Sequence, residues 1–470
     1  MYPKCHFLCL LSAALILLTI PSGAQNNQDG RSWLTTVDRA ALFAQQPEPL
    51  HFSEAKSDAP AIVVNDMEQY QPIEGLGFAL TGGSAQLLMQ MTPERRATLL
   101  KRLFTTDGDG IGVSYLRVSI GASDMNDHVY SYDDVPPGDS DPNLTKFSLA
   151  PDKTTVIPIL KEILEIDPHV KILGSPWSAP AWMKTNDKVK GGYLKPEYYG
   201  AYAQYLVKYI EGMKAEGIPI TAITVENEPL NPKNTPSMVV FAQEEDTLIG
   251  KYLGPAFEKE GITTEIQIYD HNPDVTSYPL SILADPVASK YVAGTAFHLY
   301  GGDSSALTCV HNEYPNKNLY LTEEGLGGQP GELTIDIAEP VSRVLITGTR
   351  NWVRNVLLWN LAADPHAGPH TNDGGCPVCY GAVTLDGDNA SFNEAYYAMA
   401  HFSKFVRPGS VRIGSTQLEQ LETAAFLTPK GKVVLVVANT GNFPKTFQIA
   451  YHSESTTTTL HSESVATYVW

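Results

Sequence analysis

The stretch Ile220-Thr221-Ala222-Ile223-Thr224-Val225-Glu226-Asn227-Glu228-Pro229 decides the fold, because its apolar, β-branched run turns acidic where it ends. A second stretch, Leu319-Tyr320-Leu321-Thr322-Glu323-Glu324-Gly325, repeats the pattern later in the chain. In a parallel α/β barrel the C-terminal ends of the strands form a mouth where reactive groups gather. Taken alone, each acidic end is equally compatible with a helix N-cap or a solvated loop charge. Two acidic ends that both follow predicted strands of the same barrel favour a fold that brings the glutamates together at its mouth.

Around these two strands, short apolar runs alternate with helical stretches between about residues 73 and 405. Apolar residues at i, i+3 and i+4 predict helices in 198–213 and 333–350. Thr92-Pro93-Glu94 has the hydroxyl cap and the proline of a helix start. Eight such units predict an α/β fold, a closed (β/α)8 TIM barrel. The predicted strands are 75–80, 113–118, 170–174, 220–225, 265–269, 294–298, 318–322 and 354–359.

Both ends of the chain depart from this alternation. Residues 408–470 contain short strand-like runs, such as Lys432–Ala438, between turn-rich segments, and residues 31–72 have the same character. We therefore expect the N- and C-terminal segments to form one attached β-sandwich that includes Trp470. The predicted division is a signal peptide at 1–24, an N-terminal sandwich segment at 25–72, the barrel at 73–405 and the C-terminal sandwich at 406–470.

The N-terminus predicts export. Lys4 precedes the apolar segment Phe7–Ile20, and Ser22-Gly23-Ala24 offers a small-residue cleavage site. The apolar segment is shorter than the roughly 20 residues that span a membrane, and no other segment is longer. We therefore expect a protein without an integral membrane segment that is secreted, periplasmic or held at the cell surface.

Cleavage of the signal would leave three cysteines, Cys309, Cys376 and Cys379, which suit one disulfide and one free thiol. Cys376-Pro-Val-Cys379 also has the spacing of a zinc or redox motif, with Asp364, His366 and His370 nearby. A structural zinc site needs four ligands, and a second Cys-x-x-Cys does not occur in the sequence. We expect a disulfide that staples the loop, and we expect no metal and no cofactor.

Composition restricts the partners. The formal net charge is −19, with 43% hydrophobic and 18% charged residues, which is typical of a globular protein. An acidic chain without a basic stripe argues against nucleic acid and anionic membranes. A neutral polymer remains compatible with this charge, and we expect a monomer.

Two carboxyl groups brought together from separate strands are what hydrolysis of a glycosidic bond requires. One donates a proton to the leaving oxygen while the other attacks the anomeric carbon. The candidates are Glu228 and Glu323, and Glu324 is the rival of Glu323 because neighbouring strand residues point to opposite sides. Burial is expected to raise the pKa of Glu228. Asn227 precedes Glu228, and its amide can bond a sugar 2-hydroxyl.

Further candidates stand at other strand ends. Tryptophans can stack on a sugar ring, which favours Trp177 and Trp359, whereas Trp182 is equally suited to capping the core. Arginine beside a carboxylate favours its ionised form, so Arg117 is preferred over Asp124. Two polar aromatic residues share one face after the sixth strand, and either can bond a carboxylate or a hydroxyl: His298 and Tyr300.

The sequence resembles glycoside hydrolase family 30 from about Gly75 to Trp470. The motifs that carry the resemblance are Gly75-Leu-Gly-Phe78, Ser175–Asn186, Thr224–Pro229, Ala284–Val292 and His401–Phe405. The resemblance implies a barrel with an attached β-sandwich and a retaining, double-displacement mechanism. It also implies that Glu228 is the acid/base and Glu323 the nucleophile.

Two departures bear on the substrate. Gly82-Gly83 stands where the glucosylceramidases of this family have an aspartate that grips a terminal glucose, and Leu299 stands where they have tryptophan. The glycine pair and the loop 368–379 are similar to bacterial members linked to β-1,6-glucan. We expect a secreted hydrolase of β-glucosidic bonds in a β-1,6-glucan. The alternatives are a glucosylceramidase, an exo-acting β-glucosidase and a non-catalytic carbohydrate-binding protein, which would have no need of both glutamates.

Overall fold

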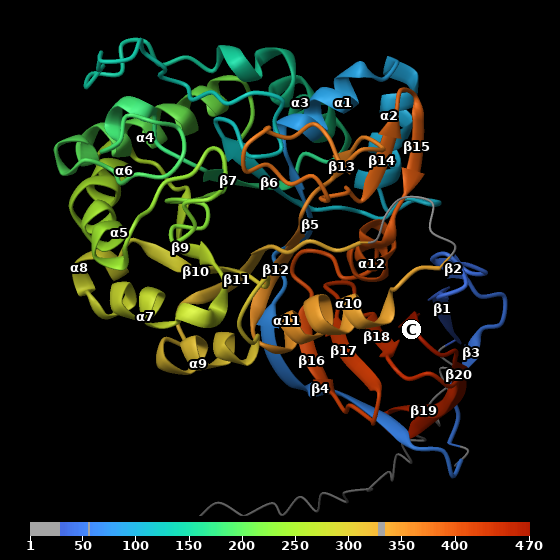
Figure 1. Cartoon of the computed structure of the whole chain (residues 1–470). Helices are drawn as coiled ribbons and strands as arrows, with labels where there is room; N and C mark the ends of the chain where they lie inside the picture. Colours follow the sequence, from blue (N-terminus) through green and yellow to red (C-terminus); the bar gives the residue numbers. More distant parts are fainter. Residues whose placement is uncertain (1–28, 55–56, 328–333) are drawn as a thin grey trace, which may run out of the picture.

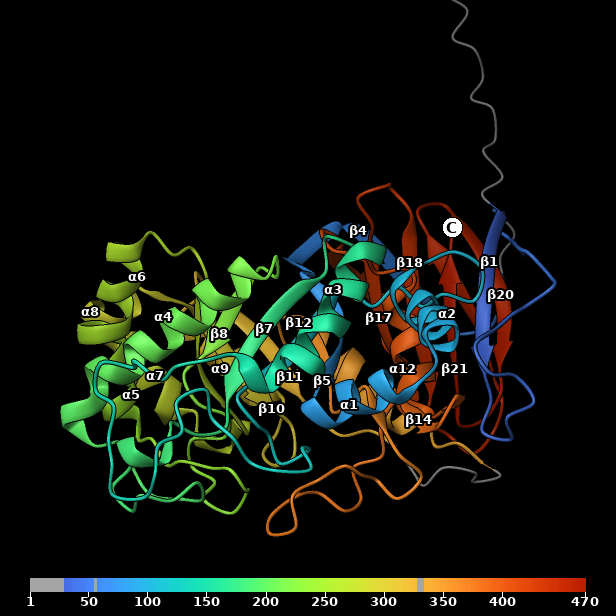
Figure 2. The same ribbon diagram turned by 90° about the horizontal axis from the view of Figure 1, so that it is seen from above.

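The computed structural model describes residues 29–54, 57–327 and 334–470. The predicted signal peptide lies outside the described residues. Among the described helices, not one is long and apolar enough to cross a membrane. Figures 1 and 2 show the two parts of the molecule, a barrel ringed by helices and a sheet of blue and red strands beside it.

Eight parallel strands close into the predicted barrel, in the order β10-β11-β12-β5-β6-β7-β8-β9. All eight predicted strands are present, and their borders move by two residues at most. Gly77 shows why a glycine recurs in the first of them, since a Cβ there would lie 1.9 Å from the carbonyl oxygen of Tyr115. The strands are β5 (Gly75–Leu80), β6 (Tyr115–Ile120), β7 (Lys171–Pro176), β8 (Ala222–Thr224), β9 (Glu265–His271), β10 (Val292–His298), β11 (Asn318–Glu323) and β12 (Val353–Leu358).

Helices follow the strands and cover the barrel (Figure 1). The predicted helix 198–213 is α4, whereas the predicted helix 333–350 begins only at Ala338. Helix α2 begins at Pro93 as predicted, but the Thr92 hydroxyl donates to Asp388 and does not cap the helix. The helices are α1 (Gly82–Gln90), α2 (Pro93–Phe104), α3 (Val156–Ile166), α4 (Tyr199–Ala215), α5 (Ala242–Leu248), α6 (Gly254–Glu260), α7 (Ser277–Ala284), α8 (Pro286–Ser289), α9 (Ser305–Glu313), α10 (Ala338–Pro340), α11 (Thr347–Arg350) and α12 (Glu394–Ser403).

Both ends of the chain form the predicted sandwich. One continuous sheet runs β2-β1-β21-β18-β17-β16-β4-β19-β20, and the N-terminal strand β4 lies between two C-terminal strands. Trp470 is buried in its core. The strands are β1 (Asp29–Thr35), β2 (Ala44–Gln45), β3 (Leu50–His51), β4 (Ala61–Pro72), β16 (Val411–Ser415), β17 (Leu421–Leu427), β18 (Val433–Asn439), β19 (Lys445–Tyr451), β20 (Glu454–Leu460) and β21 (Ser464–Val469), and a separate small sheet holds β13 (Ala362–Ala363), β14 (Val383–Asp386) and β15 (Asn389–Phe392).

Strand β18 joins the two hydrophobic cores because both of its faces are buried. Val433, Leu435 and Val437 lie in the core of the sandwich. The alternate residues Val434 and Val436 belong to the barrel core. Side chains of a strand alternate between faces, so an unbroken apolar run fits only a strand that is covered on both sides.

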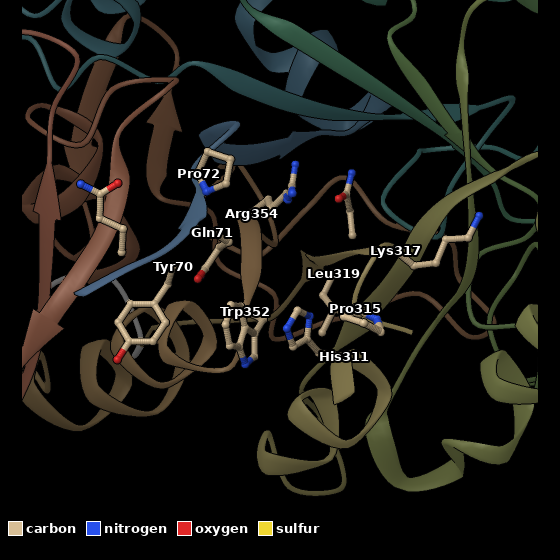
Figure 3. Close-up of a pocket in the computed structure, with 11 residues that line it drawn as sticks. Tyr70, Gln71, Pro72, His311, Pro315, Lys317, Leu319, Trp352 and Arg354 are labelled. Atoms are coloured by element: carbon tan, nitrogen blue, oxygen red, sulfur yellow. The ribbon is translucent and has the colours of Figure 1, made fainter. Parts of the chain in front are cut away.

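A pocket of about 240 Å³ lies between the sandwich and the barrel, away from β18, where β4 ends and β11 and β12 begin (Figure 3). Its aromatic side chains are packed on one another, since the rings of His311 and Trp352 stack at 3.8 Å and Tyr70 meets Trp352 edge-on at 5.6 Å. This position is at the N-terminal ends of the barrel strands, which in this fold serve stability.

His401 of α12 is a buried link between barrel and sandwich. Its Nε2 is 2.8 Å from the Thr35 hydroxyl of β1, and its Nδ1 is 2.8 Å from the Thr467 hydroxyl of β21. Burial among neutral partners lowers the pKa of His401 to about 3. The folded protein therefore keeps this imidazole uncharged where the unfolded chain, with a pKa near 6.5, binds a proton.

We expect this link to weaken in mild acid. A depressed histidine pKa costs no stability above about pH 6.5 and about 1.4 kcal/mol for each pH unit below it, so the loss at pH 5 is about 2 kcal/mol. Urea unfolding at pH 7.5 and pH 5 measures it. His401→Gln should lack this part of the pH dependence, and His461→Gln, which changes an exposed histidine, should keep it. An identical acid loss in wild type and His401→Gln would refute the assignment.

Candidate active site

The C-terminal ends of the barrel strands carry the polar side chains of a single site. Each strand is apolar along most of its length, and where it ends, alternation turns its last side chains into the mouth. The side chains that meet there are Arg117 of β6, Ser175 of β7, Asn227 and Glu228 after β8, Asp270 of β9, His298 of β10 and Glu323 of β11.

Arg117 is fully buried within this group. Its Nη1 donates to Oε2 of Glu323 at 2.5 Å, and its Nη2 donates to Oδ2 of Asp270 at 2.7 Å. Nη2 also donates to the side-chain oxygen of Asn227 at 2.7 Å, which leaves the Asn227 amide nitrogen to donate elsewhere. A buried guanidinium that faces two carboxylates favours the ionised form of both.

Glu228 adopts a left-handed backbone conformation with φ of 47°, which is uncommon for a residue other than glycine. Its amide donates to the carbonyl oxygen of Asp270 at 3.0 Å and ties the turn after β8 to β9. Asn231 Nδ2 donates to Oε2 of Glu228 at 2.7 Å. Because Glu228 is only 7% exposed, its carboxylate is held in place before a ligand enters.

Asp270 is the buried carboxylate to which several side chains of the site are hydrogen-bonded. The buried carboxylate would be hard to ionise by itself, but Arg117 and His298 hold its pKa well below the usual range. Each of its oxygens therefore acts as a fixed acceptor. Oδ2 accepts from Arg117, from the Ser175 hydroxyl at 2.6 Å and from the Thr224 hydroxyl at 2.9 Å, and Oδ1 accepts from the Thr322 hydroxyl at 2.6 Å and lies 3.1 Å from Nε2 of His298.

His298 is a fully buried imidazole between three carboxylates. Its Nδ1 is 3.3 Å from Oε1 of Glu228 and 3.8 Å from Oε1 of Glu323. Burial lowers the pKa of His298, but the charge of Glu323 and the hydrogen bonds to Asp270 and Glu228 outweigh burial and raise it to about 10. In this structure His298 therefore carries a proton at neutral pH.

The pKa values of the two glutamates move in opposite directions. Burial raises the pKa of Glu323 in spite of the opposing charges of His298 and Arg117. Burial also acts on Glu228, but the hydrogen bond and charge of His298, with the bond from Asn231, lower its pKa to about 2. The prediction that burial raises the pKa of Glu228 is therefore wrong for this structure, because a protonated imidazole is bonded to the carboxylate.

Aromatic side chains form the apolar part of the mouth. Trp177 and Trp359 are both buried, with ring centroids 5.5 Å apart, and the guanidinium of Arg117 lies 4.7 Å from the Trp177 ring. Tyr300 is 48% exposed, but its hydroxyl reaches Glu323, and burial of that end together with the charge of Glu323 raises its pKa well above the usual value.

Chemically, the site presents two carboxyl groups with one histidine nitrogen as their common neighbour. Such a pair can attack an acetal carbon from one side and deliver a proton to the leaving oxygen from the other. Buried tryptophans beside them suit the apolar face of a sugar ring.

Residues 73–406 match the model of the glycosyl hydrolase family 30 TIM-barrel domain, and residues 409–468 match that of the family's beta sandwich domain. The chain belongs to glycosyl hydrolase family 30. It is an O-glycoside hydrolase, and the resemblance seen in its motifs is confirmed.

Endo-1,6-beta-glucanases and glucosylceramidases are among the proteins to which the chain is similar. An endo-1,6-beta-D-glucanase from Trichoderma harzianum is 33% identical over 92% of this chain and 91% of its own length. The lysosomal acid glucosylceramidase of Mus musculus is 29% identical over 79% of this chain and 76% of its own. A solved endo-beta1,6-glucanase superposes with a TM-score of 0.86 at 34% identity and covers 94% of this chain and 99% of its own.

All eight residues predicted for the site lie at the mouth of the family 30 barrel. The role of each residue stays a prediction. Two residues that sequence left open lie elsewhere. The indole of Trp182 donates to the carbonyl oxygen of Asp133 at 3.0 Å, and Glu324 accepts from Arg343 at 2.9 Å on the other side of the strand. The predicted eight are Glu228, Glu323, Asn227, Trp177, His298, Tyr300, Trp359 and Arg117.

Sequence reasoning missed several members of the site. Asp270 follows directly on the predicted strand 265–269, and the same acidic strand-end pattern that singled out Glu228 applies to it. The sequence pattern did not point to His271 or Asn231, because both come to face Glu228 only through the local backbone turn and the orientation of the side chain. Asp124, the less favoured candidate, is buried near both glutamates, and burial with their charges raises its pKa to about 8.

The cysteines form the expected staple, a disulfide between Cys376 and Cys379, while Cys309 is a free, exposed thiol. Both sulfurs of the disulfide are thereby lost as thiolate ligands for zinc. The disulfide packs against the cluster that contains Trp177 and Trp359. Its loop therefore borders the apolar part of the mouth.

The glycine pair at the start of α1 is also closely packed. A Cβ at Gly82 would lie 2.0 Å from Nδ2 of Asn126, and one at Gly83 would lie 2.5 Å from the carbonyl oxygen of Met125. Asn126 is itself fixed, because its side-chain oxygen accepts from the backbone of Ser123 at 2.9 Å. Close packing against this loop therefore favours glycine at 82, and an aspartate there would require the Asn126 side chain to move.

Proposed function

We propose that this family 30 enzyme hydrolyses β-1,6-linked glucan with retention of configuration, Glu323 acting as nucleophile and Glu228 as acid/base. The observation that carries the proposal is the common neighbour of the two carboxylates, Nδ1 of His298, which lies 3.3 Å from Glu228 and 3.8 Å from Glu323. A shared neighbour keeps the two carboxyl groups near one another, which is compatible with the roughly 5–5.5 Å separation of a retaining pair.

In the first step, an oxygen of Glu323 attacks the anomeric carbon while the bond to the leaving oxygen breaks. The bond from Arg117 favours the ionised form of Glu323 against the effect of burial and fixes the direction of its carboxylate. Glu228 protonates the leaving oxygen, with a proton that reaches it along its hydrogen bond from His298. The negative charge of Glu323 is the largest influence that raises the pKa of His298. Formation of the ester removes this charge, so the pKa of His298 falls and its proton can pass to Glu228.

In the second step, Glu228 takes a proton from a water molecule and returns it to His298, and the water oxygen attacks the same carbon. The ester bond to Glu323 breaks and the carboxylate returns to Arg117. Two inversions give net retention. The Asn227 amide nitrogen, freed by the bond from Arg117 to its oxygen, donates to the sugar 2-hydroxyl, and Asp124 is placed to bond another hydroxyl.

The substrate class rests on the relatives. The T. harzianum enzyme and a second relative from Aspergillus fumigatus, 36% identical over 79% of this chain, are named endo-1,6-beta-D-glucanases, and so is the solved structure with a TM-score of 0.86. The glucosylceramidase relatives are less similar, at 29% to 30% identity. We further propose that the enzyme is exported and monomeric, with the barrel at 73–405 and a sandwich formed by 25–72 and 406–470.

The test compares release of reducing ends from a linear β-1,6-glucan, a linear β-1,3-glucan and glucosylceramide at equal sugar concentration. We expect β-1,6-glucan to react at least about 10²-fold faster, since buried polar groups reject substrates whose hydroxyls do not match. Product NMR in the first minutes should show the β-anomer. Glucosylceramide as the best substrate would replace this proposal with glucosylceramidase activity, and an α-anomer would contradict retention.

A further inference from the structure

One part of the mouth has the donor atoms of a metal site. Glu228, His271 and His298 each offer one ligand atom, and these three atoms lie within 4.8 Å of one another. Nδ1 of His271 is 3.8 Å from Oε1 of Glu228, and Nδ1 of His298 is 3.3 Å from the same oxygen. Ligands placed about 2.0–2.1 Å from a tetrahedral zinc stand about 3.3 Å from one another, so small side-chain movements suffice to close the site.

His271 has an unsatisfied ligand atom. Its Nδ1 is buried and lacks a hydrogen-bond partner among the described residues. A buried nitrogen without a partner is costly, and a ligand that it could bind would remove that cost. Nothing in the two-step hydrolysis above requires His271, so its position beside Glu228 is otherwise unexplained.

The other two ligand atoms are oriented by their neighbours. Oδ1 of Asp270 lies 3.1 Å from Nε2 of His298, which turns Nδ1 toward the mouth. A carboxylate behind a histidine is the usual support of a metal-bound imidazole. Asn231 occupies Oε2 of Glu228 with a bond of 2.7 Å, so an ion would take Oε1. There it would replace the proton that Nδ1 of His298 shares with that oxygen, and binding would release this proton to the solvent.

We propose that Glu228, His271 and His298 bind a borderline divalent transition-metal ion, with zinc as the reference ion, and that the ion inhibits the enzyme. Two imidazole nitrogens and one carboxylate oxygen form the donor set of a three-ligand zinc site and do not suit magnesium or calcium. A fourth position remains for water. The ion occupies Glu228, which can then neither give nor take a proton. The site is thus a reversible block and not a cofactor site. The inhibition rests on the role proposed for Glu228, whereas the binding does not.

The experiment uses untagged protein freed of metal with a chelator. Isothermal titration with Zn²⁺ should show one site, and titration with Co²⁺ should produce the visible absorption of a four-coordinate ion. Hydrolysis of β-1,6-glucan should fall with the same midpoint as zinc binding and return when chelator is added. His271→Gln should weaken zinc binding at least about 100-fold, because it removes one of three ligands. The matched control His366→Gln changes an exposed histidine of the 364–380 loop and should leave binding unchanged.

Each outcome decides. Absence of binding at millimolar Zn²⁺, or equal binding in wild type and His271→Gln, overturns the site. If His271→Gln does not fold, Glu228→Gln takes its place and should weaken binding to a similar degree. Stoichiometric binding that leaves hydrolysis unchanged overturns the inhibition. If the protein hydrolyses none of the glycosides yet binds zinc through His271, the metal site stands and the proposed function fails.

Discussion

Replacing Glu323 with alanine is expected to abolish hydrolysis, with a loss on the order of 10⁶-fold, as found when a hydrolase loses its nucleophile. Without Glu323 no glycosyl-enzyme forms, so good and poor leaving groups fail alike. Glu228→Ala should lose about 10²- to 10⁴-fold on glucan, the usual contribution of proton transfer. It should still react with the dinitrophenyl glycoside of a β-1,6-linked disaccharide, whose leaving group needs no proton, and should accumulate glycosyl-enzyme.

Azide distinguishes the two roles by stereochemistry. In Glu323→Ala it fills the space of the missing carboxylate and attacks a β-glycosyl fluoride from the α face, which gives the α-azide. In Glu228→Ala it attacks the glycosyl-enzyme from the β face and gives the β-azide. Product NMR therefore should show opposite anomers. Glu324→Ala is the matched control, because Glu324 faces away and is bonded to Arg343. The same anomer from both variants, or loss of turnover only in Glu324→Ala, would reverse the assignment.

The second large effect is expected from Asp270→Asn. The substitution removes a buried negative charge that bonds both Arg117 and His298, and loss of one partner of a buried ion pair costs about 3–5 kcal/mol. Because these two residues in turn hold Glu323 and Glu228, we expect kcat to fall about 10²-fold or more with KM changed less than about threefold. Steady-state kinetics on β-1,6-glucan measures both constants.

The control for Asp270→Asn is Glu226→Gln, which changes a buried carboxylate beside the same mouth. Glu226 bonds the hydroxyl of Tyr202 on the outer side of β8, and burial raises its pKa well above the usual value. Glutamine keeps the size of this side chain, and the bonds of Arg117 and His298 described above do not involve Glu226, so kcat should stay within about threefold. A fall in kcat as large as that of Asp270→Asn would show that both variants merely loosen the barrel. An unchanged kcat in Asp270→Asn would remove Asp270 from the positioning of the site.

The sequence by itself determined the barrel and the shared sandwich, and it predicted that two glutamates lie at the barrel mouth. The prediction of the barrel mouth rests on a local rule, since apolar runs that end in acidic residues mark the ends of barrel strands. The predicted strand 432–438 is β18, and the structure adds that its apolar residues 433–438 are covered on both faces. Asp270 obeyed the same rule as Glu228, but the predicted strand stopped one residue before it.

Tertiary structure alone decided what surrounds these residues. Side chains far apart in sequence set the pKa of Glu228, because His298 from another strand is hydrogen-bonded to it, and pattern reasoning had no access to that bond. Close packing favours glycine at 82, because Asn126 from the next unit fills the adjacent space. His271 faces Glu228 through a bend at the end of β9, where Tyr269 and Asp270 have φ of 77° and 54°. Periodicity fixes which residues reach the mouth, whereas contacts between strands fix their charge, their neighbours and their chemistry.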